Sequence, residues 1–388
     1  MEGDFIKINE WLKPLSWIYG CVVGVRNFLF DIGVLKSRSF SIPVISVGNI
    51  TVGGTGKTPH VEYLVDLLKD IVNVAVLSRG YKRKTKGFLI ANDKTTAQDI
   101  GDEPFQIKKR YPEIVVAVDK KRVHGIEMLT CTGNNIDVIL LDDAFQHRYV
   151  KPGVNILLVD YHRLIIYDKL LPAGRLREPL SGKNRADIVI VTKCPKTLKP
   201  MEFRVITKAM NLYPYQHLYF TTLRYDCLHH LYNERTRELS DITPDEHVLL
   251  LTGIASPRQL IEDLSPYVTH LTPLTFPDHH AFSKNDIRNI NEKFASLPSP
   301  KSIITTEKDA ARIACIEGLS EEVRQNIYSL PVKIQFMLEQ QTSFNENIIG
   351  YVRKNSRNSI LVKDKDDHQS EDSHRSGNGA WTISFRNN

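Results

Sequence analysis

The chain has 388 residues, which is enough for two domains with hydrophobic cores of their own. Its 41% hydrophobic and 25% charged residues are ordinary for a globular protein, and a net charge of +6 suits an anionic substrate or a membrane surface without indicating nucleic acid. The five cysteines are scattered with no C-x-x-C pair, which argues against a structural zinc site and favours reduced thiols on a cytosolic face.

Residues 1–40 form an N-terminal segment whose longest apolar run, residues 15–25, is too short to span a bilayer and does not resemble a signal peptide. Trp11 and Trp17, with basic neighbours, suit a helix that lies in the membrane interface. A helix packed on the domain core is the alternative, and the pattern alone slightly favours it. Read as a helix, the segment carries one apolar stripe: Trp11, Leu15, Ile18, Val22, Val25, Leu29 and Ile32.

A glycine-rich loop at residues 48–58 follows the apolar, strand-like run 42–47 and opens onto an apolar helical stripe that begins at Val61. In this order, strand, loop and helix form a cradle for nucleotide phosphates, with Mg²⁺ held by the Thr58 hydroxyl. The strict pattern has glycine where this chain has Thr51, so an incidental glycine-rich turn is the alternative. We favour nucleoside triphosphate binding. The predicted phosphate-binding residues are Gly53, Gly54, Thr55, Gly56, Lys57 and Thr58.

Residues 41–195 have the pattern of a nucleotide-binding domain. Near-continuous apolar runs indicate strands buried on both faces of a parallel sheet. The prediction is a P-loop NTPase-like, doubly wound α/β domain with its active groups at the carboxyl ends of the strands. The expected strands after the glycine loop are residues 74–77, 114–118, 138–141, 154–159 and 188–191.

Asp142 and Asp143 follow the strand at 138–141, where a P-loop fold places the acidic partner of Mg²⁺. The two carboxylates could instead begin a turn, but the upstream phosphate loop favours the metal site. Residues 144–148 add further polar groups at the same edge of the sheet.

Two more loops carry candidate groups. Residues 78–87 hold five basic side chains after a predicted strand, which indicates either anion binding or a solvated loop, without the aromatic residues of a nucleic-acid surface. Asp102, with Pro104 beyond it, suits a helix N-cap. It could also be the general base of a kinase. Composition alone favours the cap.

Taken together, these motifs resemble the tetraacyldisaccharide 4′-kinase family, the lipid A 4′-kinases of Gram-negative bacteria. The resemblance covers roughly residues 11–350. It implies an ATP- and Mg²⁺-dependent enzyme of lipopolysaccharide biosynthesis that phosphorylates the 4′-hydroxyl of a tetraacylated glucosamine disaccharide 1-phosphate. It also implies a peripheral position on the cytoplasmic face of the inner membrane, reached through the N-terminal helix. The motifs are residues 46–59, 78–81, 101–104, 141–148, 171–179, 276–279 and 306–309.

The resemblance also assigns roles to particular residues. Asp102 becomes the catalytic base, supported by His279 from the second domain, with His280 as the alternative in that loop. Lys57 becomes a catalytic residue of the phosphate loop. The metal and phosphate ligands are Thr58, Glu103, Asp142, Asp143 and Gln146. The contacts to substrate and phosphate are Arg79, Arg177 and Glu178.

Residues 196–352 are expected to form a second, smaller α/β domain that closes the active-site cleft, with strands near residues 248–251 and 303–306. Residues 218–222 and 227–232 are expected to pair as a hairpin near the domain junction. Residues 353–388 are polar and predict a disordered tail.

Two other functions compete with the lipid kinase. A switch or partitioning ATPase uses a similar loop, but its signature lysine falls at Val52 here. A guanine-nucleotide binder would need an aspartate where Pro195 follows residues 191–194. We therefore expect neither a nucleic acid nor an obligate protein partner.

Overall fold

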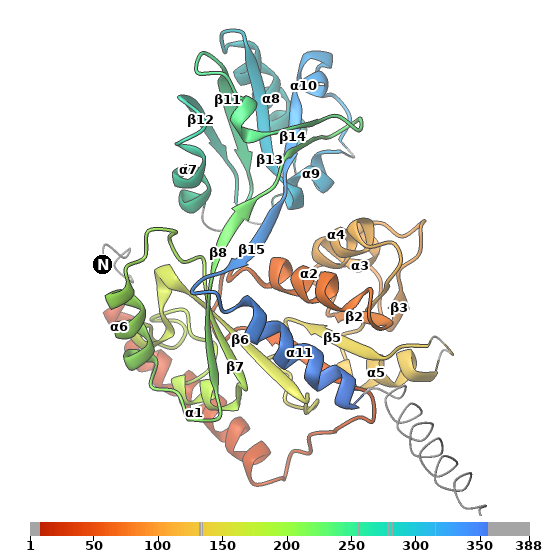
Figure 1. The fold of residues 1–388 in the computed structure, drawn as a ribbon, viewed down its shortest axis with the longest axis vertical. Helices are drawn as coiled ribbons and strands as arrows, with labels where there is room; N and C mark the ends of the chain where they lie inside the picture. Colours follow the sequence, from red (N-terminus) through yellow and green to blue (C-terminus); the bar gives the residue numbers. More distant parts are fainter. Residues whose placement is uncertain are drawn as a thin grey trace, which may run out of the picture.

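The computed structural model describes residues 8–355 except 132, 134, 255, 256, 278, 279, 281 and 315. Almost all of the predicted tail therefore lies outside the described residues. The described chain forms two α/β lobes joined by a ribbon of two strands, as Figure 1 shows.

The first lobe is built on a nine-stranded, mostly parallel sheet with the strand order β15-β8-β7-β6-β1-β5-β2-β4-β3. Every strand expected in the nucleotide domain is present, and the predicted fold class is confirmed. β1 lies between β5 and β6, so that Val47 is paired with Asp142 and the phosphate loop leaves the sheet beside the acidic end of β5. The strands are β1 (Val44–Gly48), β2 (Val74–Ser78), β3 (Leu89–Ile90), β4 (Val115–Val118), β5 (Val138–Asp142), β6 (Val154–Asp160), β7 (Ile188–Thr192), β8 (His217–Tyr225) and β15 (Val332–Phe336).

Helices cover both faces of this sheet because successive residues of the buried strands point to opposite sides. α2 (Lys57–Leu68), α4 (Asp102–Arg110) and α11 (Gln341–Asn355) cover one face, and their apolar side chains pack on Ile45 and Val47. α5 (Arg122–Cys131) and α6 (Pro200–Met210) cover the other. The shorter helical elements of this lobe are η1 (Glu10–Leu12), α3 (Ala97–Ile100), η2 (Tyr161–Arg163), η3 (Ile165–Tyr167) and η4 (Leu180–Arg185).

The second lobe has a six-stranded sheet with the order β10-β9-β14-β13-β11-β12 and two apolar cores of its own. Its strands are β9 (Leu228–His230), β10 (Thr236–Arg237), β11 (His247–Thr252), β12 (His270–Thr275), β13 (Lys301–Thr306) and β14 (Ile327–Leu330). Its helical elements are η5 (Leu239–Asp241), α7 (Arg258–Leu264), α8 (Lys284–Ala295), α9 (Glu307–Ile313) and α10 (Glu321–Gln325).

The chain crosses between the lobes twice, along β8 and back along β15. These two strands pair antiparallel with each other, and β8 also pairs parallel with β7 (Figure 1). The predicted hairpin is wrong, because β9 pairs with β10 and β14 instead of β8. The physical reason is that β8 is a nine-residue strand that pairs with β7 and β15 in the first sheet before the chain enters the second lobe.

The N-terminal helix α1 (Lys13–Asp31) turns most of its apolar stripe away from the core. Trp11 and Trp17 are 91% and 78% exposed, and Ile18, Val22 and Val25 are each more than half exposed. The stripe is therefore not the core-packed face that the pattern alone favoured. None of the helices in the described part of the chain is long and apolar enough to cross a membrane.

Candidate active site

Hydrogen bonds from Asn49 at the start of the phosphate loop and from Thr192 of β7 fix the loop at Thr55. Asn49 Nδ2 donates to Thr55 Oγ1 at 3.0 Å, and Thr192 Oγ1 donates to the Thr55 carbonyl at 3.0 Å. Gly53 and Gly56 have φ angles of 121° and 79°, a region that side chains other than glycine rarely adopt. Gly56 is also the N-cap of α2, so the backbone is turned to present N–H groups at the helix N-terminus.

The carboxylate of Asp142 is buried at the end of β5, next to this loop. Ser78 Oγ donates to its Oδ2 at 3.0 Å, while Oδ1 is buried with no hydrogen-bond partner among the described residues. Burial, together with the nearby Asp143 and Glu103 carboxylates, raises the pKa of Asp142 to about 6, against the lowering effects of Lys57 and the Ser78 hydrogen bond. A buried acceptor without a donor is the state in which a carboxylate can take a metal ligand role.

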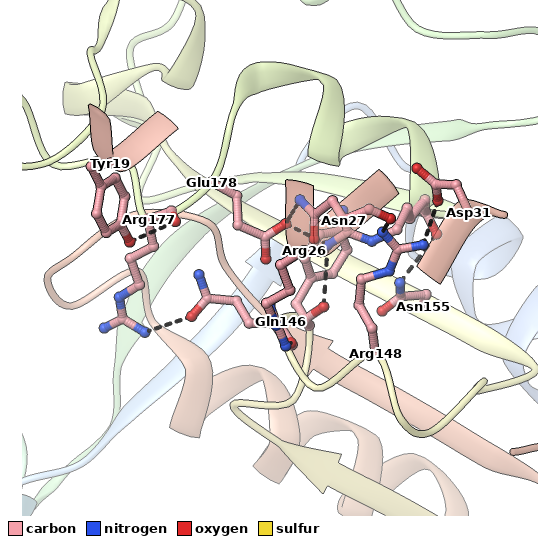
Figure 2. Close-up of polar contacts among 11 residues, drawn as sticks. Tyr19, Arg26, Asn27, Asp31, Gln146, Arg148, Asn155, Arg177 and Glu178 are labelled. Atoms are coloured by element: carbon pink, nitrogen blue, oxygen red, sulfur yellow. Dashed lines mark hydrogen bonds and ion pairs between the residues drawn. The ribbon is translucent and has the colours of Figure 1, made fainter. Parts of the chain in front are cut away.

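Asp143 lies between Lys57 at the end of the phosphate loop and Arg177 in the loop after η3. Its Oδ1 lies 3.6 Å from Lys57 Nζ and its Oδ2 lies 3.9 Å from Arg177 Nη1. Arg177 Nη1 also donates to Gln146 Oε1 at 3.5 Å, as Figure 2 shows. Four of the predicted site residues thus meet at one point beside the phosphate loop.

A cavity of about 690 Å³ opens beside this point and extends to α1. Five cationic side chains and two carboxylates line it, which makes it suited to an anionic ligand. Its lining residues are Tyr19, Val23, Arg26, Val52, Arg79, Lys120, Lys121, Asp143, Gln146, His147, Leu171, Arg177 and Glu178.

Helix α1 forms one wall of the cavity through polar contacts that Figure 2 displays. Tyr19 donates its hydroxyl to the Arg177 carbonyl at 2.9 Å, and Arg26 Nη2 donates to the Gln146 carbonyl at 3.2 Å. Asn27 Nδ2 lies 3.4 Å from Glu178 Oε2. The position of α1 is therefore tied to the residues that line the site.

Glu178 is 1% exposed and forms an ion pair with Arg185 at 2.8 Å. Its other oxygen, Oε1, is buried and finds no hydrogen-bond donor within the part of the chain that the structure describes.

The cavity wall also contains His147. Burial lowers the pKa of this histidine to about 4, and the cations Arg122 and Arg79 act in the same direction. His147 is therefore neutral at neutral pH and can donate or accept a hydrogen bond without adding charge.

Asp102 and Glu103 begin α4. The N-cap is Gly101, and no side chain caps this helix, so the interpretation of Asp102 as a cap is wrong. Asp102 instead forms an ion pair with Arg312, and Glu103 lies 3.2 Å from Lys308, both on α9 of the second lobe.

Two histidines, His279 and His280, follow Phe276 in the segment before α8. His279, the predicted partner of Asp102, lies outside the described residues. His280 Nε2 lies 3.0 Å from Asp286 Oδ2, and its ring stacks on Phe276. His280 therefore contacts Asp286 in the first turn of α8.

The comparisons with known proteins decide the family. The family model described as LpxK, tetraacyldisaccharide-1-P 4′-kinase, matches residues 8–353. The chain belongs to this family. The resemblance inferred from the motifs, and with it a kinase enzyme of lipid A biosynthesis, is confirmed.

Relatives and a solved structure agree with the family match. The tetraacyldisaccharide 4′-kinase of Phocaeicola vulgatus is 60% identical over 364 residues, which covers 92% of this chain and 99% of the relative. That of Porphyromonas gingivalis is 44% identical over 360 residues, covering 90% and 99%. A crystal structure of LpxK from Aquifex aeolicus in complex with ATP is 31% identical, with a TM-score of 0.67 over 88% of this chain and 98% of that one.

Sequence reasoning missed several residues of the site of this family member. Lys120 and Lys121 follow β4, so the rule that active groups lie at the carboxyl ends of parallel strands could have found them. Tyr19 and Arg26 reach the cavity from a helix that the sequence offered as a membrane or core element. No sequence signal pairs Arg312 with Asp102, because their contact depends on how the two lobes meet.

Proposed function

We propose that this chain transfers the γ-phosphate of ATP to the 4′-hydroxyl of a tetraacylated glucosamine disaccharide 1-phosphate. The observation that carries the proposal is that the phosphate loop and a cation-lined cavity share Asp143 and Val52 in their walls. A donor site and an acceptor site for two anionic molecules therefore lie next to each other. Holding two reactants in this way accounts for a large part of phosphoryl-transfer catalysis.

The donor binds at the glycine loop. The Aquifex relative, by its title, was crystallised with ATP. In this chain the backbone N–H groups of residues 53–58 cradle the β- and γ-phosphates, and the ammonium of Lys57 neutralises the charge that develops on the transferred group. Removing either contribution would raise the activation barrier of phosphoryl transfer without altering the fold.

The residues at the end of β5 fit a Mg²⁺ ion. The unpartnered Oδ1 of Asp142 and the exposed side of Asp143 supply hard oxygen ligands, and Thr58, Glu103 and Gln146 complete the proposed set. Among the described residues no three His, Cys, Asp or Glu side chains gather closely enough to hold a metal by themselves. Mg²⁺ normally takes one or two carboxylates together with phosphate oxygens and waters. When bound, it would neutralise charge on the phosphates.

The acceptor binds in the cavity. Arg79, Arg177 and the neighbouring lysines suit the phosphate of a disaccharide 1-phosphate, and Glu178 suits a sugar hydroxyl. Because α1 forms one wall, exposes most of its apolar stripe and carries the exposed Trp17, acyl chains can leave the cavity along α1 into a bilayer. This arrangement supports a peripheral position on the cytoplasmic face of the inner membrane.

Asp102 is the proposed base, with His279 as its proposed partner. A carboxylate that accepts the proton of the attacking hydroxyl as the phosphoryl group arrives makes a weak nucleophile effective. Asp102 lies at the N-terminus of α4, and Glu103 beside it is close enough to raise the pKa of Asp142. This proximity supports assigning the proposed base and the proposed metal ligands to one site.

The decisive experiment measures phosphate transfer from ATP to the purified disaccharide 1-phosphate in mixed micelles. We expect a singly phosphorylated product that requires lipid, ATP and Mg²⁺ together. ATP consumption that is independent of lipid, or stimulated only by a protein partner, would contradict the proposal and favour a switch ATPase.

A further inference from the structure

Helix α9 of the second lobe lies against α4 of the first, antiparallel to it, at the junction visible in Figure 1. Among the described residues, three ion pairs join the two helices. At the end of α4, Arg110 lies 3.5 Å from Glu307, and the other two pairs are Lys308 with Glu103 and Arg312 with Asp102. Because pairs form at both ends of the two helices, the contact of Arg312 with Asp102 belongs to a defined register between the lobes.

Arg312 is held rigidly within its own lobe. Its Nη1 lies 3.3 Å from Oδ1 of Asp309, a fully buried residue. The other oxygen of Asp309 accepts hydrogen bonds from the Gly253 backbone N–H at 2.8 Å and from Thr306 Oγ1 at 2.7 Å. Contacts within the second lobe therefore help to fix the direction of the guanidinium group.

The pair that Arg312 makes is shielded from solvent. The Arg312 side chain is 12% exposed and the Asp102 side chain 25%, well below the more than 50% exposure of each member of surface pairs such as Arg258 with Glu262. A charge-assisted hydrogen bond to a planar guanidinium fixes both the charge and the orientation of a carboxylate. Asp102 is the proposed base, so its orientation decides whether it can meet the acceptor hydroxyl.

We propose that Arg312 is a positioning residue for Asp102. It adds to what the second lobe contributes to the catalytic site, since docking of α9 on α4 brings its guanidinium to the base. This role requires no contact between Arg312 and the substrate. It holds the carboxylate in the orientation that meets the acceptor hydroxyl. The proposal rests on the proposed function, because it assigns Arg312 a role only through the phosphoryl-transfer reaction.

The test compares Arg312→Ala and Arg312→Lys in the otherwise unchanged chain and in the Asp102→Asn background. We expect Arg312→Ala to lower kcat about 10- to 100-fold, with the KM for ATP unchanged, since misplacing a reacting group by about 1 Å can cost about 100-fold. Arg312→Lys should recover part of the loss, and added guanidinium should partly rescue Arg312→Ala. In Asp102→Asn the same substitution should cost much less, because the carboxylate that Arg312 is proposed to orient has been removed.

Arg288→Ala is the matched control, since Arg288 forms an exposed pair with Glu292 on α8 of the same lobe. It should leave kcat unchanged. If Arg312→Ala fails to fold, judged by thermal unfolding, Arg312→Lys in both backgrounds carries the test. A loss of equal size in both backgrounds would indicate lobe packing alone and would overturn the proposal.

The failure of this inference differs from the failure of the proposed function. An active wild-type chain whose Arg312 variants keep full kcat overturns the positioning role alone. A wild-type chain that phosphorylates no lipid overturns the proposed function, and the positioning role with it.

Discussion

Lys57 Nζ lies 3.6 Å from Asp143 Oδ1, so the lysine of the phosphate loop is already paired with an acidic residue at the end of β5. The Lys57 and Asp143 side chains are 19% and 38% exposed, and Asp143 also lines the cavity. An arriving triphosphate has to share this lysine with Asp143. A cation that bridges the carboxylate and the phosphates would make such sharing favourable.

Replacing Lys57 should therefore remove transition-state stabilisation rather than folding. We expect Lys57→Ala to lower kcat about 10²- to 10³-fold, the loss typical of one preorganised electrostatic donor. Thr58→Ala should be similarly impaired and should need more Mg²⁺. Lys69→Ala, at the other end of α2, is the control and should keep normal kinetics. Near-normal turnover in Lys57→Ala would contradict the phosphate-loop assignment.

Asp102→Ala and His279→Ala test the proposed base and its partner. Each should lower kcat by about 10²- to 10⁴-fold, the range for general-base catalysis, with little change in the KM for ATP. The double variant should lose far less than the product of the two single losses, because the pair acts as one unit. Steady-state kinetics at saturating lipid measures this, and losses that multiply independently would rule out a dyad. A fully active His279→Ala would redirect the search to His280.

The exposed stripe of α1 should carry membrane binding. Deleting residues 1–35 would weaken that binding, but it would also remove Tyr19 and Arg26 from the cavity wall. Ile18→Asp and Val22→Asp are cleaner, since both side chains are exposed. Each should reduce partitioning onto anionic vesicles by about 10-fold or more, because burying such a side chain contributes roughly 1.5–3 kcal/mol.

Co-sedimentation with vesicles measures this effect, and the KM for the lipid should rise in parallel. Ile71→Asp, at an exposed apolar residue beyond α2, is the charge-matched control. Unchanged vesicle binding by folded α1 variants would show that the stripe has another use.

The buried carboxylate of Asp142 should cost stability at neutral pH. Its pKa of about 6 lies above the ordinary 3.8, so between these values the native chain binds more protons than the unfolded chain. The free energy of unfolding therefore falls as the pH rises from about 4 to about 6, and the penalty is fully present above that range. Without nucleotide or Mg²⁺, Asp142→Asn should raise Tm at pH 8, because the free energy of unfolding gains about 2–3 kcal/mol. At pH 4 the gain should be much smaller.

Thermal unfolding at the two pH values checks this expectation. The exposed Asp70→Asn should change Tm equally little at both. The same Asp142→Asn chain should lose most of its kinase activity, since it gives up a proposed metal ligand. A Tm gain that is independent of pH would refute the assigned origin of the penalty.

Much of the first lobe could be predicted from the sequence because its central strands are buried on both faces. Runs such as residues 138–141 and 188–191 are apolar at every position, and each forms the strand expected of it. The return of the chain could not be predicted in this way. β15 and α11 join the first sheet after the whole second lobe, and nothing local in residues 332–355 states which sheet they complete.

The residues of the site also fall into a group that local sequence pattern predicts and a group that it does not. Residues next to the glycine loop or at strand ends, such as Lys57, Asp142 and Asp143, follow from local pattern and the rules of parallel sheets. Arg26 and Arg312 do not, because their roles depend on the docking of α1 and α9 against distant parts of the chain. A local sequence pattern predicts which face of a segment is buried. It does not predict which charged residue from a distant part of the chain will contact that segment.

The hydroxyl of Tyr351 accepts a hydrogen bond from the backbone N–H of Val44 at 3.2 Å, across 307 positions of sequence. Phe344, Ile348 and Val352 of the same helix cover the core face behind the phosphate loop. A ribosome therefore has to release nearly the whole described chain before the first sheet can close, although the strand at its centre emerges early. In chains stalled on the ribosome before residue 341, we expect pulse proteolysis to cleave the first lobe. The second lobe, complete by residue 330, is free to fold first, so the order of translation is not the order of assembly.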